Sequence, residues 1–219
     1  TYTGSYTGAV EVGGPFAVRE LPGVTITKVA TNPFNNNCYL LRDSSTAETL
    51  LVDAAGDAPR LLEALGDGKL VGIVETHGHW DHQQALEEVV AATGAPVFAT
   101  AADAADLPLP VDRVLADGDI ITVGATKLRA ITLVGHTPGS VAIYLNIEGG
   151  HLFSGDSLFP GGVCNTEKDP ERFLSLMRDV ETKLFDKLPN SCWVYPGHGS
   201  DTTLGAERPH LAEWHARGW

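Results

Sequence analysis

Four metal-ligand side chains fall within six positions of this chain, at His77, His79, Asp81 and His82. Because the 219 residues contain only eight histidines, this cluster is far denser than a scattered distribution would give. Imidazole nitrogen and carboxylate oxygen are the ligand atoms that zinc and similar borderline metals prefer. A sharp turn between a strand and a helix lets the first two side chains point one way and the last two another. The spacing therefore predicts two adjacent metal ions rather than one.

Three further segments end an apolar run with a ligand-type side chain in a turn rich in glycine or proline. These side chains are His136, Asp156 and His198. Loops at the ends of strands carry many of the binding and catalytic residues of rigid scaffolds. Either histidine taken alone would be an ordinary loop residue, and Asp81 alone would be a helix cap. Four such junctions in one chain favour a common metal site.

In their order along the chain, the seven side chains resemble the ligand series of the metallo-β-lactamase superfamily. The series is His77, His79, Asp81, His82, His136, Asp156 and His198. The turns at residues 135–140, 155–159 and 195–199 resemble the glyoxalase II-type branch, the hydroxyacylglutathione hydrolases. The resemblance covers roughly residues 24 to 210. It is to a short form, because the chain stops at Trp219 without the basic helical region of the long form.

The resemblance implies a role for each of these side chains. His77, His79 and His136 would hold the first metal ion. Asp81, His82 and His198 would hold the second, and Asp156 would bridge the two. Asp81 would also act in catalysis by orienting the attacking hydroxide through its second oxygen. An aspartate at the bridging position is typical of the thioesterase and lactonase branches and argues against an antibiotic-hydrolysing role. The implied ions are divalent and are expected to be zinc, with iron or manganese as alternatives.

The implied reaction is hydrolysis of a thioester or ester of a small acyl substrate by a hydroxide that bridges two metal ions. The sequence contains no Gly-x-Ser-x-Gly motif, which agrees with water as the nucleophile. Residues 161–166 lack the arginine of the corresponding family segment, which weakens the case for glutathione. Lys168, Arg172 and Arg208 are candidate substitutes.

Three alternatives remain open. A lactonase would use the same ions, and a tyrosine near them would favour it, with Tyr39, Tyr144 and Tyr195 as candidates. A mononuclear-iron persulfide dioxygenase would fill only the half of the site that contains His77 and His79. A non-catalytic relative that kept the fold is the third, and the intact ligand set argues against it.

Composition excludes several classes of partner. The net charge of −13 argues against nucleic acid, because phosphate binding needs clustered Lys and Arg. No apolar run reaches the roughly 18–20 residues that a membrane helix requires, and no leader-like segment opens the sequence.

Cys38, Cys164 and Cys192 are odd in number and widely spaced, which is typical of reduced thiols. We therefore expect a cytoplasmic location. Cys164 follows the Asp156 turn and could line the site.

The apolar pattern predicts an α/β fold. Strands are expected at residues 24–29, 38–41, 49–52, 70–74, 97–99, 120–123, 127–134, 141–147, 152–153 and 193–195. Helices are expected at residues 57–65, 82–92 and 169–187. The two successive halves, 24–115 and 119–215, suit the four-layer αββα sandwich of the metallo-β-lactamase type, with the metals along one edge.

We expect one metallo-β-lactamase-like domain over residues 21–219. Residues 1–20 would form a frayed tail or an edge hairpin, or alternatively an aromatic arm over the site mouth or over the partner subunit of a homodimer. His151 follows two glycines and is expected at the surface.

Overall fold

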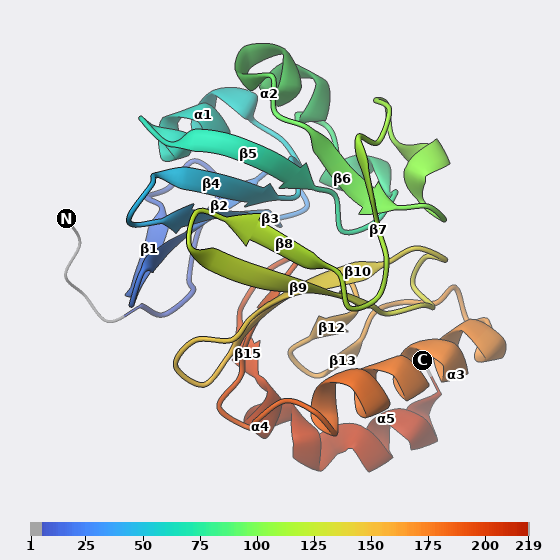
Figure 1. The fold of residues 1–219 in the computed structure, drawn as a ribbon. Coiled ribbons are helices and arrows are strands. Elements are labelled where there is room, and N and C mark those ends of the chain that lie inside the picture. The colour runs from blue at the N-terminus through green and yellow to red at the C-terminus, as the bar shows by residue number, and fades with distance from the viewer. Residues whose placement is uncertain (1–5, 219) are drawn as a thin grey trace.

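The computed structural model describes residues 6–218. Over these residues the chain forms four layers, with two β-sheets packed face to face and helices on the outer side of each sheet (Figure 1). The α/β sandwich predicted from the sequence is confirmed. Each half of the chain supplies one sheet together with the helices that cover it.

The first half forms a sheet of seven strands within the described residues, and they lie in sequence order. The strands are β1 (Ala17–Leu21), β2 (Val24–Thr31), β3 (Asn36–Asp43), β4 (Glu48–Val52), β5 (Lys69–Val74), β6 (Val97–Thr100) and β7 (Arg113–Leu115). Strands β1 to β4 are antiparallel, whereas β4 to β7 are parallel. Parallel neighbours need crossover connections. Helix α1 (Ala58–Leu65) connects β4 to β5 and α2 (Leu86–Thr93) connects β5 to β6, whereas the connection from β6 to β7 contains a 3₁₀ turn, Ala104–Asp106. Asp57 caps α1 through the Arg60 amide, and Gly66 ends it.

The second half forms a sheet with the order β15-β14-β11-β10-β9-β8. Its strands are β8 (Ile120–Val123), β9 (Thr126–Thr132), β10 (Val141–Leu145), β11 (His151–Gly155), β14 (Trp193–Pro196) and β15 (Thr202–Thr203). A small hairpin of β12 (Leu158–Phe159) and β13 (Gly162–Val163) follows β11. The parallel pair β11 and β14 is connected by α3 (Pro170–Asp179), which continues as a π-helical segment, Val180–Phe185. The chain ends with α4 (Leu204–Glu207) and α5 (Leu211–Arg217).

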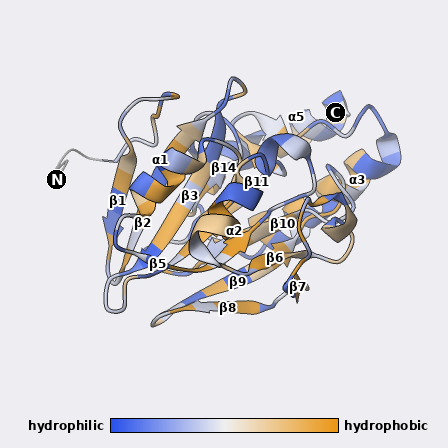
Figure 2. Ribbon diagram, turned by 90° about the horizontal axis from the view of Figure 1, so that it is seen from above, coloured by the Kyte–Doolittle hydropathy of each residue, from blue (hydrophilic) through white to orange (hydrophobic). Residues whose placement is uncertain are grey.

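Three apolar clusters among the described residues hold the layers together. The central cluster lies between the sheets and joins residues such as Ile26 and Leu41 to Phe153. A second cluster packs α1 and α2 on the first sheet, with Leu61 at its centre, and a third packs the C-terminal helices on the second sheet around Leu176. Figure 2 shows hydrophobic stretches along central strands such as β3. Burial of these faces is the main stabilising contribution to the sandwich.

Two local expectations were wrong. The helix expected from residue 82 begins only at Leu86, and a 3₁₀ turn, Trp80–His82, precedes it. The side chain of Gln83 donates to the carbonyl oxygens of Gly78 and Asp106 and so holds this irregular segment. His151 is only 1% exposed rather than a surface residue. It begins a strand between β10 and β14, and its Nδ1 lies 2.9 Å from the Tyr195 hydroxyl.

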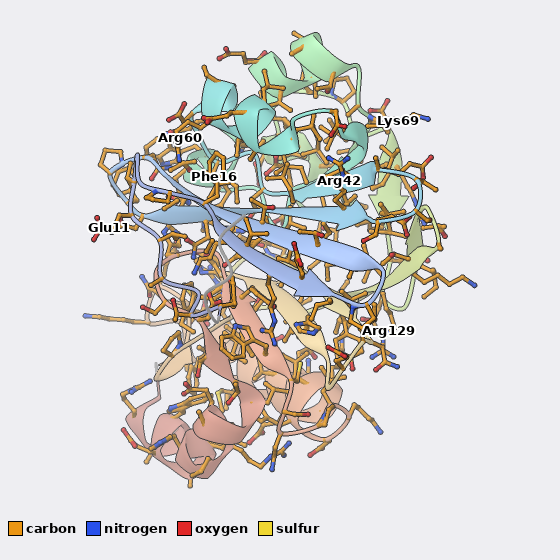
Figure 3. All side chains as sticks on the ribbon, turned by 90° about the vertical axis from the view of Figure 1, so that its left-hand side faces the viewer. Glu11, Phe16, Arg42, Arg60, Lys69 and Arg129 are labelled. Atoms are coloured by element: carbon orange, nitrogen blue, oxygen red, sulfur yellow. The ribbon has the colours of Figure 1, made fainter. Side chains whose placement is uncertain are left out.

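The segment before β2 lies along the edge of the first sheet. β1 pairs with β2 as an antiparallel hairpin, one of the three arrangements expected for the N-terminal residues. Before it, the guanidinium of Arg60 donates to the Gly14 carbonyl and stacks on the Phe16 ring at 4.6 Å from the centroid (Figure 3). Residues 1–5 lie outside the described part, and the homodimer stays a prediction. No helix between residues 6 and 218 is long and apolar enough to cross a membrane.

Candidate metal centre

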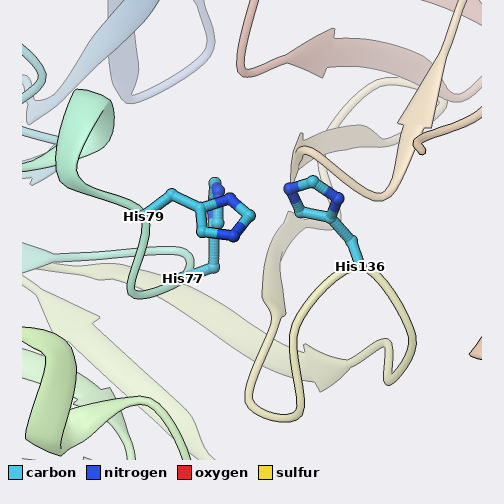
Figure 4. A group of neighbouring side chains, drawn as sticks. All are labelled: His77, His79 and His136. Carbon is cyan, nitrogen blue, oxygen red and sulfur yellow. The ribbon is translucent and has the colours of Figure 1, made fainter. Parts of the chain in front are cut away.

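The first group of candidate ligands comes from two facing loops. His77 and His79 follow β5, with ring centroids 4.8 Å apart, and His136 follows β9. The His136 centroid lies 5.0 Å from that of His77 and 4.6 Å from that of His79. Figure 4 shows the rings directed toward one another across the gap between the loops. One nitrogen from each ring lies within 4.8 Å of the others, so the three can share one ion.

The second group lies directly beside the first. The Nε2 atoms of His82 and His198 are 3.1 Å apart. Oδ2 of Asp81 lies 3.5 Å from each of them. The three donor atoms thus form a second compact set.

Asp156, at the end of β11, lies between the two groups. Its carboxylate is 3.4 Å from Nε2 of His82, 3.2 Å from that of His198 and 3.7 Å from that of His136. The structure therefore brings all seven sequence-predicted side chains to one place, contributed by loops at the ends of strands from both sheets.

Unpartnered buried atoms show that this donor set fits metal ions. Nε2 of His77, Nε2 of His136 and Oδ1 of Asp156 are buried and have no hydrogen-bond partner. Buried polar atoms are nearly always paired, because leaving one unpaired costs free energy. Two histidine nitrogens and a bridging-type carboxylate oxygen left unpaired at one point are the donor atoms that a dinuclear centre would use.

Four histidine rings are oriented by partners on their other nitrogen, and for His77 this partner is the Thr76 hydroxyl, 3.1 Å from Nδ1. Nδ1 of His82 donates to Asp53 at 2.8 Å, Nδ1 of His136 to the Asn165 carbonyl at 2.8 Å, and Nδ1 of His198 to the Phe34 carbonyl at 2.9 Å. Each bond leaves Nε2 facing the centre, as is usual for metal-binding histidines. The protonation assigned to each ring follows from these partners.

Sequence reasoning missed Asp53, although it follows the apolar strand β4 directly, as the other site residues follow theirs. Its carboxylate accepts hydrogen bonds from the backbone amide and the hydroxyl of Thr76, at 2.7 and 2.9 Å. Burial, and then the charge of Asp53, raise the pKa of the neighbouring Glu75 well above its usual range, which favours an uncharged Glu75. The Asp53 carboxylate is therefore the negative partner of His82 outside the two ligand groups.

The electrostatics divide the site into two kinds of histidine. Burial lowers the pKa of His77 and of His136, which keeps both rings neutral and ready to bind a cation. Burial alone would also lower the pKa of His82, but the carboxylates of Asp156 and Asp53 raise it well above its usual range. Burial of Asp156 is likewise outweighed by the charge of His82 and by hydrogen bonds from His198, which hold its pKa well below the usual range.

Further side chains that the sequence did not indicate hold the ligand loops. Asp103 accepts hydrogen bonds from the Gly78 amide at 2.9 Å and from the Thr137 hydroxyl at 2.6 Å, so it ties together the two loops of the first group. Arg172 donates to the carbonyl oxygens of residues 135 and 136. Asn36 donates to Oδ2 of Asp81 at 3.0 Å. These residues lie in a loop, a helix and the start of strand β3, and no spacing in the sequence signals their contacts with the ligand loops.

The candidate tyrosines point their hydroxyl groups to partners outside the metal centre. Tyr39 donates to the Pro196 carbonyl at 2.6 Å, Tyr195 lies against His151, and Tyr144 donates to Asn146. The feature that would have favoured a lactonase is thus not supported at these three positions. Cys164 does lie beside the site, with Sγ within 4.8 Å of ligand atoms of His136 and Asp156, and burial raises the pKa of its thiol to about 12.

Two proteins have sequences similar to that of this chain. A protein of Aquifex aeolicus (strain VF5), described as uncharacterized, is 30% identical over 200 residues, which cover 84% of this chain and 93% of the relative. A hydroxyacylglutathione hydrolase of Fuscovulum blasticum is 43% identical over 130 residues, which cover 58% of this chain and 50% of the relative. The chain thus matches about half the length of that hydrolase.

Solved structures share the fold. The BLEG-1 B3 metallo-beta-lactamase superposes with a TM-score of 0.78 at 27% identity, over 85% of this chain and 97% of that one. ETHE1 from Myxococcus xanthus gives 0.76 at 25% identity, over 85% and 82%. TTHA1623 in a di-iron-bound form gives 0.67 at 32% identity, over 83% and 96%. The profile of the metallo-beta-lactamase superfamily matches residues 31–203, and the chain belongs to this superfamily.

Proposed function

We propose that this chain is a dinuclear metal-dependent hydrolase that cleaves a thioester or ester of a small acyl substrate. One observation carries the proposal: the Asp156 carboxylate lies within 3.2–3.7 Å of Nε2 of His82, His136 and His198. A carboxylate in that place lies beside donor atoms of both ligand groups and could therefore bind to both ions. The similarity to hydroxyacylglutathione hydrolases supports the same class of reaction.

The residues of the two groups would hold one divalent ion each, with Asp156 shared between them. Bound divalent ions supply a water that is ionised near neutral pH and polarise a carbonyl oxygen. Asn36 fixes Oδ2 of Asp81, so that the second oxygen of this carboxylate can accept a hydrogen bond from the attacking water. Asp81 is therefore proposed as the residue that orients the nucleophile. Zinc is the proposed metal, although the di-iron form of TTHA1623 shows that iron suits a related centre.

Three aromatic side chains lie on the His198 side of the proposed site. Phe34 and Trp80 are 53% and 61% exposed and pack edge to face with their ring centroids 5.7 Å apart. Trp80 lies between two candidate ligands in the sequence, and the carbonyl of Phe34 bonds to His198. The Phe159 ring lies 6.2 Å from that of His198. This rim would pack against an apolar part of the substrate and displace water from the scissile bond.

Contacts of two basic residues weigh against glutathione as the thiol part. Arg172 is used by backbone carbonyls of the His136 loop and by Glu167, and Arg208 donates to Asn190. Neither is therefore offered as a ligand for the carboxylates of the tripeptide. We propose a small thioester whose thiol part makes fewer ionic contacts than glutathione would. A small-molecule substrate and a cytoplasmic location are parts of the same proposal.

A mononuclear-iron persulfide dioxygenase is the second candidate, because His77, His79 and His136 could hold a single ion by themselves. Such an enzyme would need a metal ion in only one of the two ligand groups. The facing Nε2 atoms of His82 and His198, with Asp81 beside them, favour a second ion and hence the hydrolase.

Elemental analysis of the purified protein, combined with a thioester panel, tests the choice. About two ions per chain together with release of free thiol would support the hydrolase. The panel should hold the acyl group constant and compare glutathione with a small neutral thiol. One iron per chain, with oxygen uptake on addition of a persulfide and no thiol release from thioesters, would overturn the proposal.

A further inference from the structure

A fully buried ion pair lies just beyond the candidate ligand His198. The side chain of Lys28, on β2, is 0% exposed, and that of Asp201 is 1% exposed. Nζ of Lys28 donates to Oδ1 of Asp201 at 2.6 Å and to the carbonyl oxygens of Gly8 and Gly199, each at 2.8 Å. The three hydrogens of the ammonium group are thereby all used.

The second oxygen of Asp201 is equally engaged. Oδ2 accepts hydrogen bonds from the Tyr6 hydroxyl and from Nε1 of Trp193, both at 2.9 Å. The Tyr6 ring packs against the rings of Trp193 and Tyr195, with centroids 5.9 and 6.2 Å away. The N-terminal segment thus closes over the ion pair and shields it from water.

The pair joins three segments that are far apart in the sequence: residues 6–8, strand β2 and the loop at 197–201. That loop carries His198. Asn37 fixes the same loop from the other side, because its amide group donates to the carbonyl oxygens of Pro196 and Gly199 at 3.0 and 2.9 Å. The backbone on both sides of His198 is therefore held by buried polar contacts.

Glycine at position 8 allows the N-terminal segment to approach this closely. Gly8 has a φ of +73°, and a Cβ atom there would lie 2.2 Å from Oδ2 of Asp201. Any larger residue would both strain the backbone and displace the carboxylate. The approach of residues 6–8 to the ion pair is thus specified by the sequence.

We propose that the Lys28–Asp201 pair, closed by Tyr6, is a positioning device that sets the place of His198 in the second metal group. The inference rests on the proposed function only in assigning His198 to a second ion. A buried ion pair contributes little net stability compared with apolar residues of similar size, but its fixed geometry holds the attached segments in one arrangement. Here that arrangement directs the His198 ring toward Asp156 and His82.

Three variants test the device. Lys28→Met and Asp201→Asn remove one charge each, and Tyr6→Phe removes a single hydroxyl group and should leave the fold intact. Leu61→Ala, in the cluster under α1, is the control for general destabilisation, because it lies in a different apolar layer. Each protein is loaded with zinc, and the affinity of each ion is measured by competition with a chromophoric chelator.

We expect the affinity for one of the two ions to fall about 10- to 100-fold in the two charge variants and less in Tyr6→Phe, as found for residues that orient metal ligands. The affinity for the other ion, and both affinities in Leu61→Ala, should stay unchanged. Two ions bound with unchanged affinities in all variants would overturn the inference and leave the proposed hydrolase intact.

Backbone hydrogen exchange of the metal-free proteins gives a second readout that does not depend on metal count. The amides of Gly197 and Gly199 bond to the carbonyls of Gly155 and Asn35. Faster exchange at these amides in the charge variants, but not in Leu61→Ala, supports the positioning role even if the natural protein binds one ion and the proposed function fails. Unchanged exchange refutes it.

Discussion

Protonation of His151 should destabilise the fold in mild acid. In the folded protein the ring is buried, and burial together with the nearby guanidinium of Arg19 lowers its pKa from 6.5 to about 4. Arg19 donates to the Tyr195 hydroxyl at 3.1 Å, so that this hydroxyl can donate in turn to Nδ1 of His151. A proton on Nδ1 would leave the N–H of His151 and the O–H of Tyr195 as two donors facing each other. It would also place a second positive charge near Arg19.

The sign and size of the effect follow from linkage. The pKa is lower in the folded than in the unfolded state, so the unfolded chain binds the proton more tightly and stability falls as pH drops from about 6.5 toward 4. The shift corresponds to about 3 kcal/mol in full, of which roughly 2 kcal/mol is lost between pH 7 and pH 4.5. The candidate metal ligands titrate as well, so the effect of His151 must be isolated by difference.

Urea unfolding of metal-free wild type and His151→Gln at pH 7 and pH 4.5 makes that comparison. We expect the variant to lose about 2 kcal/mol less than the wild type over this interval. NMR titration of the His151 ring provides a direct check. An equal acid-induced loss in both proteins, or a ring that titrates near 6.5 in the folded wild type, would refute the reasoning.

Three other perturbations address the site. Asp156→Ala should lose bound metal and hydrolysis together, and retention of two ions with activity would contradict the bridging assignment. Asp53→Asn should lower the affinity for one ion by about 10- to 100-fold in a chelator competition. Asp67→Asn, which changes an exposed carboxylate, should leave both affinities unchanged. Trp80→Ala should raise the KM for thioesters with an apolar acyl group by about 2- to 10-fold with little change in kcat, because an aromatic contact contributes about 0.5–1.5 kcal/mol. Leu174→Ala, also exposed, is the matched control, and an equal rise in its KM would contradict the assigned contact.

The strands and helices with a regular apolar pattern were predictable from the sequence. The apolar runs at β5 and β9 ended where the ligand motifs began, so strand ends and candidate ligands could be located together. The irregular turn at Trp80–His82 was not predictable, because its shape depends on Gln83 reaching carbonyls in another loop. Local pattern cannot show such tertiary contacts.

The partners around the candidate ligands escaped prediction for a related reason. Asp53, Asp103 and Asn36 act through contacts with residues 23 to 45 positions away in the chain. His151 was misplaced because a glycine pair signals a surface turn, whereas the position of β11 between β10 and β14 buries the residue that follows. In each case the missing information is which strand lies beside which.

The distribution of the candidate ligands over the two halves of the chain has a consequence for how the molecule holds together. Four of them belong to the first sheet and its loops, and three to the second. An ion shared by these groups is a cross-link between halves that are otherwise joined mainly by an apolar interface. A ligand that binds only the native state adds its binding free energy to stability. Removing metal would therefore weaken the joint between the sheets, and two separately expressed halves would associate more tightly with these ions than through the apolar interface alone.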